Sequence, residues 1–334
     1  KQGSLSMRYR HLGKTGLKVS EIGLGTHVNF GGMRTDDECE AVLTACYECG
    51  VNMIDTAEAY NAGKAESLIG SVMKKHDWSR DSMVLCSKVI FKDREATPTQ
   101  RGLSRKHIFD AVEGSLNRLQ TDYLDIYLCH HEDPSTPVEE TCRAMSDLVQ
   151  QGKVRYWGLS NPFPYAFVPE AMSILKQVGG YLPTVKMLGW NIACPQSDTK
   201  VMEMYGDLGM GVLANVVLGG GLLTGKYTDG VPKNSRRDKL PSPKQANKNY
   251  TLVGNRNAVV FERLKKARIA EKLDLSPARL ACAWALKHPY ISSLALGAST
   301  PEQVRENAKA SEDTDKLTDE IMEEIEKLRC PEEG

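Results

Sequence analysis

The sequence predicts an α/β fold, namely a (β/α)8 TIM barrel with an N-terminal β-hairpin and extra C-terminal helices. Eight short apolar runs recur along the chain, with amphipathic segments of helical spacing between them. The runs are nearly continuous in apolar residues, as expected for a parallel sheet that is covered on its outer face. Eight such units favour a closed barrel over an open doubly wound sheet. The first turn also lacks a GxGxxG motif, which weakens the Rossmann alternative.

The expected elements follow one another without a break in composition. A hairpin is expected over Met7–Val19, where Leu12–Lys14 and Thr15–Leu17 are turn signals. The eight strands are expected at Ser20–Thr26, Asn52–Ala57, Met83–Val89, Leu124–His130, Val154–Ser160, Thr184–Asn191, Gly211–Leu218 and Ser293–Ala298. The helices are expected at Asp36–Glu48, Ser104–Leu119, Val138–Val149, Pro169–Val178, Thr199–Leu208, Val259–Lys272, Ser276–Lys287, Pro301–Ala310 and Thr318–Leu328.

The 334 residues are expected to form one domain over 7–330, with residues 1–6 as a cloning remnant. Lys and Arg (43) balance Asp and Glu (43), so no overall field favours nucleic acid or an acidic membrane. No apolar run approaches the roughly 20 residues that span a bilayer, which favours a cytoplasmic protein without direct membrane insertion. Cys46 and Cys49 lie inside an expected helix without a second pair at zinc spacing, so no metal site is expected. The polar segment Thr228–Arg256 is either a surface excursion or a lid over the barrel.

Four polar side chains stand at or just after the ends of successive expected strands. Asp55 ends the second strand and Tyr60 follows it, while Lys88 ends the third and His130 the fourth. In a barrel, such positions project into the mouth where active sites lie. A phenol is a weak acid at neutral pH, but a nearby ammonium lowers its pKa, and a carboxylate holds the ammonium in place. An imidazole N–H can orient a carbonyl, so the quartet indicates proton delivery to a carbonyl oxygen, although each residue alone is more often structural.

Several segments resemble the signature segments of the aldo-keto reductases. They are Gly23–Thr26, Asp55–Tyr60, Ser87–Lys88 and Gly158–Asn161. Further segments are similar to the voltage-gated potassium channel β-subunits, which belong to the same superfamily. These are Arg8–Gly16, Ala62–Glu66, Arg101–Ile108 and Tyr156–Gly158.

The resemblance implies that Asp55, Tyr60, Lys88 and His130 form a catalytic tetrad and that the cofactor is NADP(H). It places Ser160 and Asn161 at the nicotinamide, Ser299 and Gln303 at the 2′-phosphate, and Glu306 and Asn307 at the adenine. Lys226 and Arg236 match positions that clamp the phosphates. The full implied cofactor set is Thr26, Asp55, Ser160, Asn161, Leu218, Lys226, Arg236, Gly297, Ser299, Gln303, Glu306 and Asn307. The proximity of Ser299 to the start of an expected helix independently suits a phosphate.

The sequence departs from the family pattern at positions near the nicotinamide and substrate. Leu188 stands where the family usually has a Gln, and Asn215 where it has an aromatic ring stacked on the nicotinamide. Trp157 and Trp190 are candidates for a substitute ring. His27 replaces a family Trp, so the substrate pocket is expected to differ as well.

Two functions are compatible with these observations. The first is NADPH-dependent reduction of aldehydes or ketones to alcohols, with Tyr60 as general acid and a small carbonyl compound as substrate. The alternative is a channel β-subunit-like accessory protein that senses NADP(H) with little turnover and docks on a channel's cytoplasmic domain. Animal channel β-subunits tend to have Asn at the position of His130, which favours the reductase. The resemblance implies a homotetramer in either case.

Overall fold

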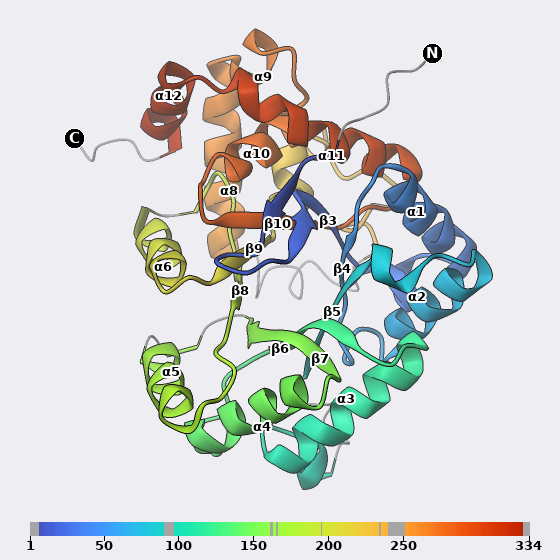
Figure 1. Ribbon diagram of the computed structural model, residues 1–334. Coiled ribbons are helices and arrows are strands. Elements are labelled where there is room, and N and C mark those ends of the chain that lie inside the picture. The colour runs from blue at the N-terminus through green and yellow to red at the C-terminus, as the bar shows by residue number, and fades with distance from the viewer. Residues whose placement is uncertain are drawn as a thin grey trace.

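The computed structural model describes residues 7–89, 97–160, 163–164, 166–194, 196–233, 235–239 and 251–329. Eight parallel strands close into a barrel in the order β10-β3-β4-β5-β6-β7-β8-β9, and helices surround it (Figure 1). The predicted TIM barrel is therefore confirmed, together with the N-terminal hairpin and the C-terminal helices. No helix among the described residues is long and apolar enough to cross a membrane.

The barrel strands are β3 (Ile22–Gly25), β4 (Met53–Asp55), β5 (Val84–Val89), β6 (Leu124–Cys129), β7 (Val154–Leu159), β8 (Val185–Gly189), β9 (Gly211–Asn215) and β10 (Ile291–Leu296). The hairpin consists of β1 (Tyr9–His11) and β2 (Lys18–Ser20). The longer helices are α1 (Asp36–Glu48), α2 (Lys64–Lys75), α3 (Arg105–Leu119), α4 (Val138–Gln150), α5 (Phe167–Val178), α6 (Gln196–Asp207), α8 (Thr251–Lys266), α10 (Pro277–Leu286), α11 (Pro301–Asp313) and α12 (Asp319–Arg329). Short helical segments are η1 (Asn29–Met33), η2 (Arg80–Ser82), η3 (Pro98–Gln100), η4 (Gly219–Thr224), α9 (Ile269–Lys272) and η5 (Thr314–Lys316).

Alternation along the strands divides the core into an interior and an outer layer. The interior cluster includes Met53, Cys86, Leu128 and Met187, and Leu12 of the hairpin packs into it. The intervening residues, such as Ile54 and Leu85, pack outward against the helices. The hairpin therefore fills one end of the barrel, which leaves the carboxyl ends of the strands as the open mouth.

Three expectations about the elements were wrong. Helix α2 was not anticipated, although Ala65, Ile69, Val72 and Met73 are buried at helical spacing along it. The single helix expected over Val259–Lys272 is two, because Arg268 adopts a left-handed conformation (φ +57°) between α8 and α9. Helix α8 also begins at Thr251, so the polar excursion ends earlier than Arg256.

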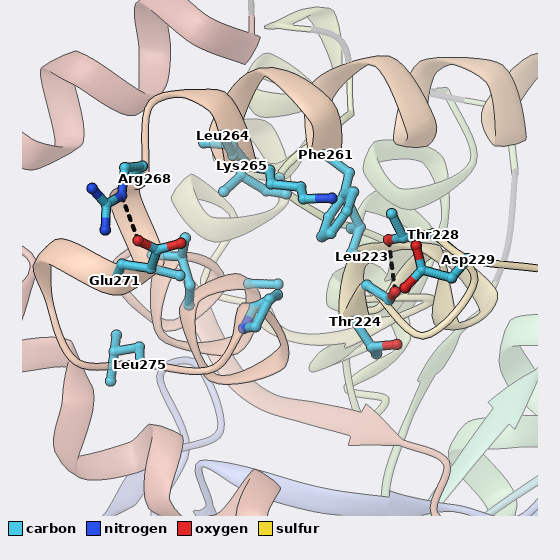
Figure 2. A pocket seen from close by; sticks show the side chains of 16 residues that line it. Leu223, Thr224, Thr228, Asp229, Phe261, Leu264, Lys265, Arg268, Glu271 and Leu275 are labelled. Carbon is cyan, nitrogen blue, oxygen red and sulfur yellow. Dashed lines mark hydrogen bonds and ion pairs between the residues drawn. The ribbon is translucent and has the colours of Figure 1, made fainter.

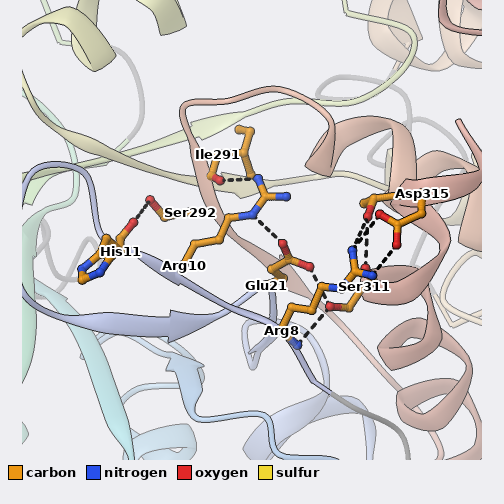
Figure 3. A network of polar contacts seen from close by, with 9 residues as sticks. Arg8, Arg10, His11, Glu21, Ile291, Ser292, Ser311 and Asp315 are labelled. Carbon is orange, nitrogen blue, oxygen red and sulfur yellow. Dashed lines mark hydrogen bonds and ion pairs between the residues drawn. The ribbon is translucent and has the colours of Figure 1, made fainter. Parts of the chain in front are cut away.

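A polar network ties the hairpin to the barrel and to α11 (Figure 3). Glu21 is buried and accepts hydrogen bonds from Arg10 Nε (2.5 Å) and Ser311 Oγ (2.6 Å). Arg10 also donates to the Ile291 carbonyl at 3.0 Å. Arg8 forms a more exposed ion pair with Asp315 at 2.5 Å. The network therefore contains one buried and one solvent-screened ion pair.

We expect Glu21→Ala to lower the free energy of unfolding by roughly 2–4 kcal/mol, because it removes the carboxylate from a buried pair and leaves Arg10 and Ser311 without their acceptor. Asp315→Asn is the control and should cost far less, since its pair is exposed and screened by solvent. Urea denaturation of both variants measures the difference. Equal losses would show that burial does not govern these pairs.

Candidate active site

The four predicted side chains come from three adjacent strands and one turn. Asp55 is the last residue of β4, Lys88 lies near the end of β5, and His130 directly follows β6. On β5 the alternation points Cys86 and Lys88 into the barrel, while the Ser87 hydroxyl points outward and donates to Glu66. All three strands end at the same rim because they are neighbours in a parallel register. The turn after β4 then brings Tyr60 back over the mouth.

Lys88 is the centre of the site. Its ammonium donates to Asp55 Oδ1 (2.5 Å), to the Thr56 carbonyl (2.8 Å) and to the Tyr60 hydroxyl (3.0 Å). Lys88 itself is fully buried, and Asp55 and Tyr60 are nearly so. One cation thus connects the carboxylate and the phenol directly.

The buried ammonium is held in its charged form. Burial by itself would lower the pKa of Lys88, but the combined attraction of Asp55, Tyr60 and Cys86 outweighs it and raises that pKa above its ordinary value. For Tyr60 the balance goes the other way. Burial raises the pKa of its phenol to about 12, and the Lys88 ammonium only partly opposes this. The phenol is therefore protonated at neutral pH, and its expected fall in pKa is not the net result.

The His130 ring stands beside the phenol, with ring centroids 6.0 Å apart at 74°. Burial, together with the charges of Lys88, His131 and His27, lowers the pKa of His130 to about 2. The imidazole is therefore neutral, so one ring nitrogen carries a proton that it can donate in a hydrogen bond.

The backbone around the quartet is fixed by hydrogen bonds between strand ends. The amide and hydroxyl of Thr26 both donate to the Asp55 carbonyl, at 3.0 and 2.9 Å. The Thr56 amide donates to the Cys86 carbonyl at 2.8 Å. Thr26, predicted at the cofactor, thus positions Asp55 in this structure.

This buried arrangement of acid, ammonium and neutral imidazole coincides with a family match. The model of the Aldo/keto reductase family matches residues 21–329. The chain belongs to this family. As an aldo/keto reductase it is an oxidoreductase, and the quartet lies within the matched region.

The position of Ser160 in this aldo/keto reductase suits a ligand amide at the mouth. Ser160 directly follows β7. Its hydroxyl is buried and has no hydrogen-bond partner within the part of the chain that the structure describes. A buried hydroxyl without a partner is costly unless a ligand or water pairs with it. Asn161, predicted beside it, lies outside the described residues.

The residues predicted to bind the adenosine end of the cofactor lie together between the end of β10 and the first turns of α11. The Gln303 side chain accepts a hydrogen bond from the Ser299 amide at 2.7 Å. Glu306 accepts from Ser276 Oγ (2.7 Å), and Asn307 is buried one residue further on. Gly297 is exposed, and a Cβ there would meet only the Gly25 carbonyl, at 3.9 Å. These residues therefore share one end of the mouth, next to a helix N-terminus that suits a phosphate.

The segment after β9 has unusual backbone geometry. Val216 has φ +57°, although β-branched residues rarely adopt it, and Gly219, Gly220 and Gly221 also have positive φ. Leu218 lies within this segment, and Lys226 follows it with an exposed ammonium. Arg236 is half-buried, and its charge acts on His27 at the mouth. The turned backbone is held by bonds within the loop, in which the Gly219 amide donates to the Val216 carbonyl and the Gly221 amide to the Leu218 carbonyl, both at 2.8 Å.

Part of the expected lid contacts the segment that follows β3. Lys239 donates to the Met33 carbonyl at 3.3 Å, which joins the segment after β9 to η1. Residues 240–250 lie outside the described residues. The described part of the segment is thus mostly exposed and touches η1 through Lys239.

Two expectations near the nicotinamide position need correction. Leu188 does not face the mouth, because it packs in the outer layer between the helices, whereas Met187 points into the barrel. Trp157 and Trp190 are buried in the same outer layer, so neither supplies a substitute ring. Asn215 does lie at the mouth. A Cβ built on Gly189 would come within 3.6 Å of the Asn215 side-chain oxygen, its one neighbour within 4 Å among the described residues. The mouth is therefore lined here by a glycine and a polar side chain.

A cavity among the described residues is lined by none of the quartet side chains; Figure 2 shows it from close by. It has a volume of about 380 Å³ between η4 and helices α8, α9 and α10. Leu223 and Phe261 line it, and Lys265 and Arg268 stand at its edge. Because Leu223–Asp229 also contains Lys226, this cavity adjoins the segment that carries Lys226 and not the reacting groups.

Two residues at the mouth were not anticipated as site residues. His131 stacks on His130 with ring centroids 4.9 Å apart. Cys86 is buried beside Asp55 and has its pKa raised by burial and by that carboxylate. The period-two alternation of β5 could have identified Cys86, whereas the direction of the His131 side chain in a loop could not be inferred.

Proposed function

We propose that this aldo/keto reductase reduces aldehydes or ketones to alcohols with NADPH and that Tyr60 is the general acid. The observation that carries the proposal is the buried ammonium of Lys88, which contacts both Asp55 and the Tyr60 hydroxyl. An ion pair whose only role was structural would not need a phenol as its third partner. The neutral imidazole of His130 completes a site for a carbonyl oxygen.

The residues present fit a nicotinamide cofactor. Ser160 would hold its carboxamide, and the residues at the start of α11, with Lys226 and Arg236, would hold its phosphates. When bound, the reduced nicotinamide supplies a hydride to the carbonyl carbon.

The chain's own residues handle the proton. Tyr60 donates its hydroxyl proton to the carbonyl oxygen as negative charge develops there. The phenolate that remains is stabilised by Lys88, which Asp55 keeps protonated. His130 donates a hydrogen bond to the same oxygen and orients the carbonyl. Burial of all four groups strengthens these interactions, since little water screens them.

The proposal is tested by fluorescence titration with NADPH, followed by turnover of 4-nitrobenzaldehyde. We expect binding in the micromolar range and consumption of NADPH that depends on the aldehyde. Absence of NADPH binding at tens of micromolar would refute the enzyme proposal. We also propose a homotetramer in solution, which light scattering after size-exclusion chromatography tests separately.

We expect Ser160→Ala to weaken NADPH binding about threefold to tenfold, because a hydrogen bond to a buried hydroxyl contributes roughly 1 kcal/mol. Ser293→Ala is a matched control. Its hydroxyl is also buried and has no partner among the described residues, but it lies deeper, beside Gly23. The same titration measures both variants, and an equal loss in the control would remove Ser160 from the cofactor site.

A further inference from the structure

Four rings form a continuous row across the mouth. The His27 ring lies 4.6 Å from the Tyr60 ring, Tyr60 lies 6.0 Å from His130, and His130 lies 4.9 Å from His131. The proposed proton donor is therefore flanked by an imidazole on each side. Only His130 has a role in the mechanism above, which leaves His27 and His131 unexplained.

His27 is placed to meet a substrate. It follows β3 directly after Thr26, which is fixed by its hydrogen bonds to the Asp55 carbonyl. Solvent reaches its side chain from the mouth, and the ring is tilted by 40° to the phenol, so it is not stacked flat on Tyr60. A carbonyl whose oxygen contacts Tyr60 would thus have its neighbouring carbon atoms within reach of His27.

The charge state of His27 restricts what it can recognise. Burial, then the positive charges of Arg236 and Lys88, lower the pKa of His27, and Asp55 opposes them only weakly. The ring is neutral at physiological pH and offers one hydrogen-bond donor and one acceptor. Burial likewise lowers the pKa of His131. Two neutral imidazoles match hydroxyl groups, which also donate and accept, better than they match a carboxylate or an alkyl chain.

We propose that His27 is a specificity-determining residue that selects carbonyl substrates with a hydroxyl group on the carbon next to the carbonyl. The inference rests on the proposed reductase function. An alkyl group at this position would remove water from His27 without replacing its hydrogen bonds, which lowers affinity. A site that hydrogen-bonds a substrate hydroxyl rejects the analogue that lacks it.

The test compares lactaldehyde with propanal, which lacks its hydroxyl group. Glyoxylate is included as an anionic aldehyde. NADPH is the reductant, and each rate is corrected for the fraction of free aldehyde. For the unmodified protein, we expect kcat/KM for lactaldehyde to exceed that for propanal and for glyoxylate at least tenfold. His27→Phe should reduce the lactaldehyde-to-propanal ratio to about one, mainly by loss on lactaldehyde. His27→Asn, which keeps a donor and an acceptor, should retain most of the ratio.

His11→Phe is the matched control, because His11 lies on β1 in the hairpin that fills the opposite end of the barrel. It should leave the ratio unchanged. A second measurement needs no variant: 1,2-propanediol should inhibit the unmodified protein at least tenfold more strongly than 1-propanol.

The outcomes separate this inference from the function on which it rests. Turnover of propanal as fast as lactaldehyde, or a ratio that survives His27→Phe, overturns the role of His27 and leaves the reductase intact. Failure of every aldehyde, with no NADPH consumed, overturns the reductase function and the inference with it. If His27→Phe does not fold, equal inhibition by the two alcohols still rejects the proposal.

Discussion

Tyr60→Phe should lower kcat about 1,000-fold while NADPH affinity stays within about twofold. The variant removes only the hydroxyl, which in the proposed mechanism is the proton donor, and general acid catalysis typically contributes 10²- to 10⁴-fold. The ring remains to pack between His27 and His130, so the shape of the mouth is retained. Initial rates at saturating NADPH and aldehyde measure kcat, and fluorescence titration measures binding.

Tyr127→Phe is the control for this experiment. Tyr127 is also a buried phenol whose hydroxyl has no partner in the described ranges, but it points from β6 into the outer layer. It should leave kcat within about twofold. Unchanged turnover in Tyr60→Phe would exclude the phenol as proton donor. His130 or a bound water would then be the candidate donors.

The fold and three of the four quartet residues could be predicted because they depend on alternation and strand ends. Asp55, Lys88 and His130 are polar residues that end apolar runs, and parallel register brings such ends to one rim. Tyr60 was found mainly because it lies five residues after Asp55 in a segment that resembles a family signature. The geometry of a turn is not encoded in hydrophobic periodicity.

The errors have physical causes of the same kind. The resemblance puts Leu188 where the family has a Gln near the nicotinamide, but in a strand of period two a one-residue shift moves a side chain from the interior to the outer layer. The break between α8 and α9 could not be predicted from a Gly or Pro, because Arg268, a non-glycine residue, adopts the left-handed conformation there. The net pKa of Tyr60 also could not be inferred, since burial, which only the structure shows, outweighs the visible Lys88 partner.

Asp55→Asn should lower the free energy of unfolding by about 3–5 kcal/mol at pH 7, because it leaves the Lys88 ammonium buried without its counter-charge. The double variant Asp55→Asn/Lys88→Met should recover a large part of this loss, since no buried charge remains. The two single variants and the double variant form a mutant cycle, and urea denaturation supplies each free energy.

The pH dependence of these variants distinguishes a buried charge pair from simple loss of packing. In the unmodified protein the folded-state pKa of Lys88 is raised, so its contribution is fully present below the unfolded value of about 10.4 and is lost only as pH rises through the higher folded value. Stability from Lys88 should therefore not change between pH 7 and 9. In Asp55→Asn, burial dominates and the folded-state pKa of Lys88 falls below the unfolded value. The unfolded state then binds more protons, so stability should rise with pH over that range. The double variant should again show no slope from this site. A flat profile in Asp55→Asn, or a double variant as unstable as the single, would mean that Asp55 does not act through the charge of Lys88.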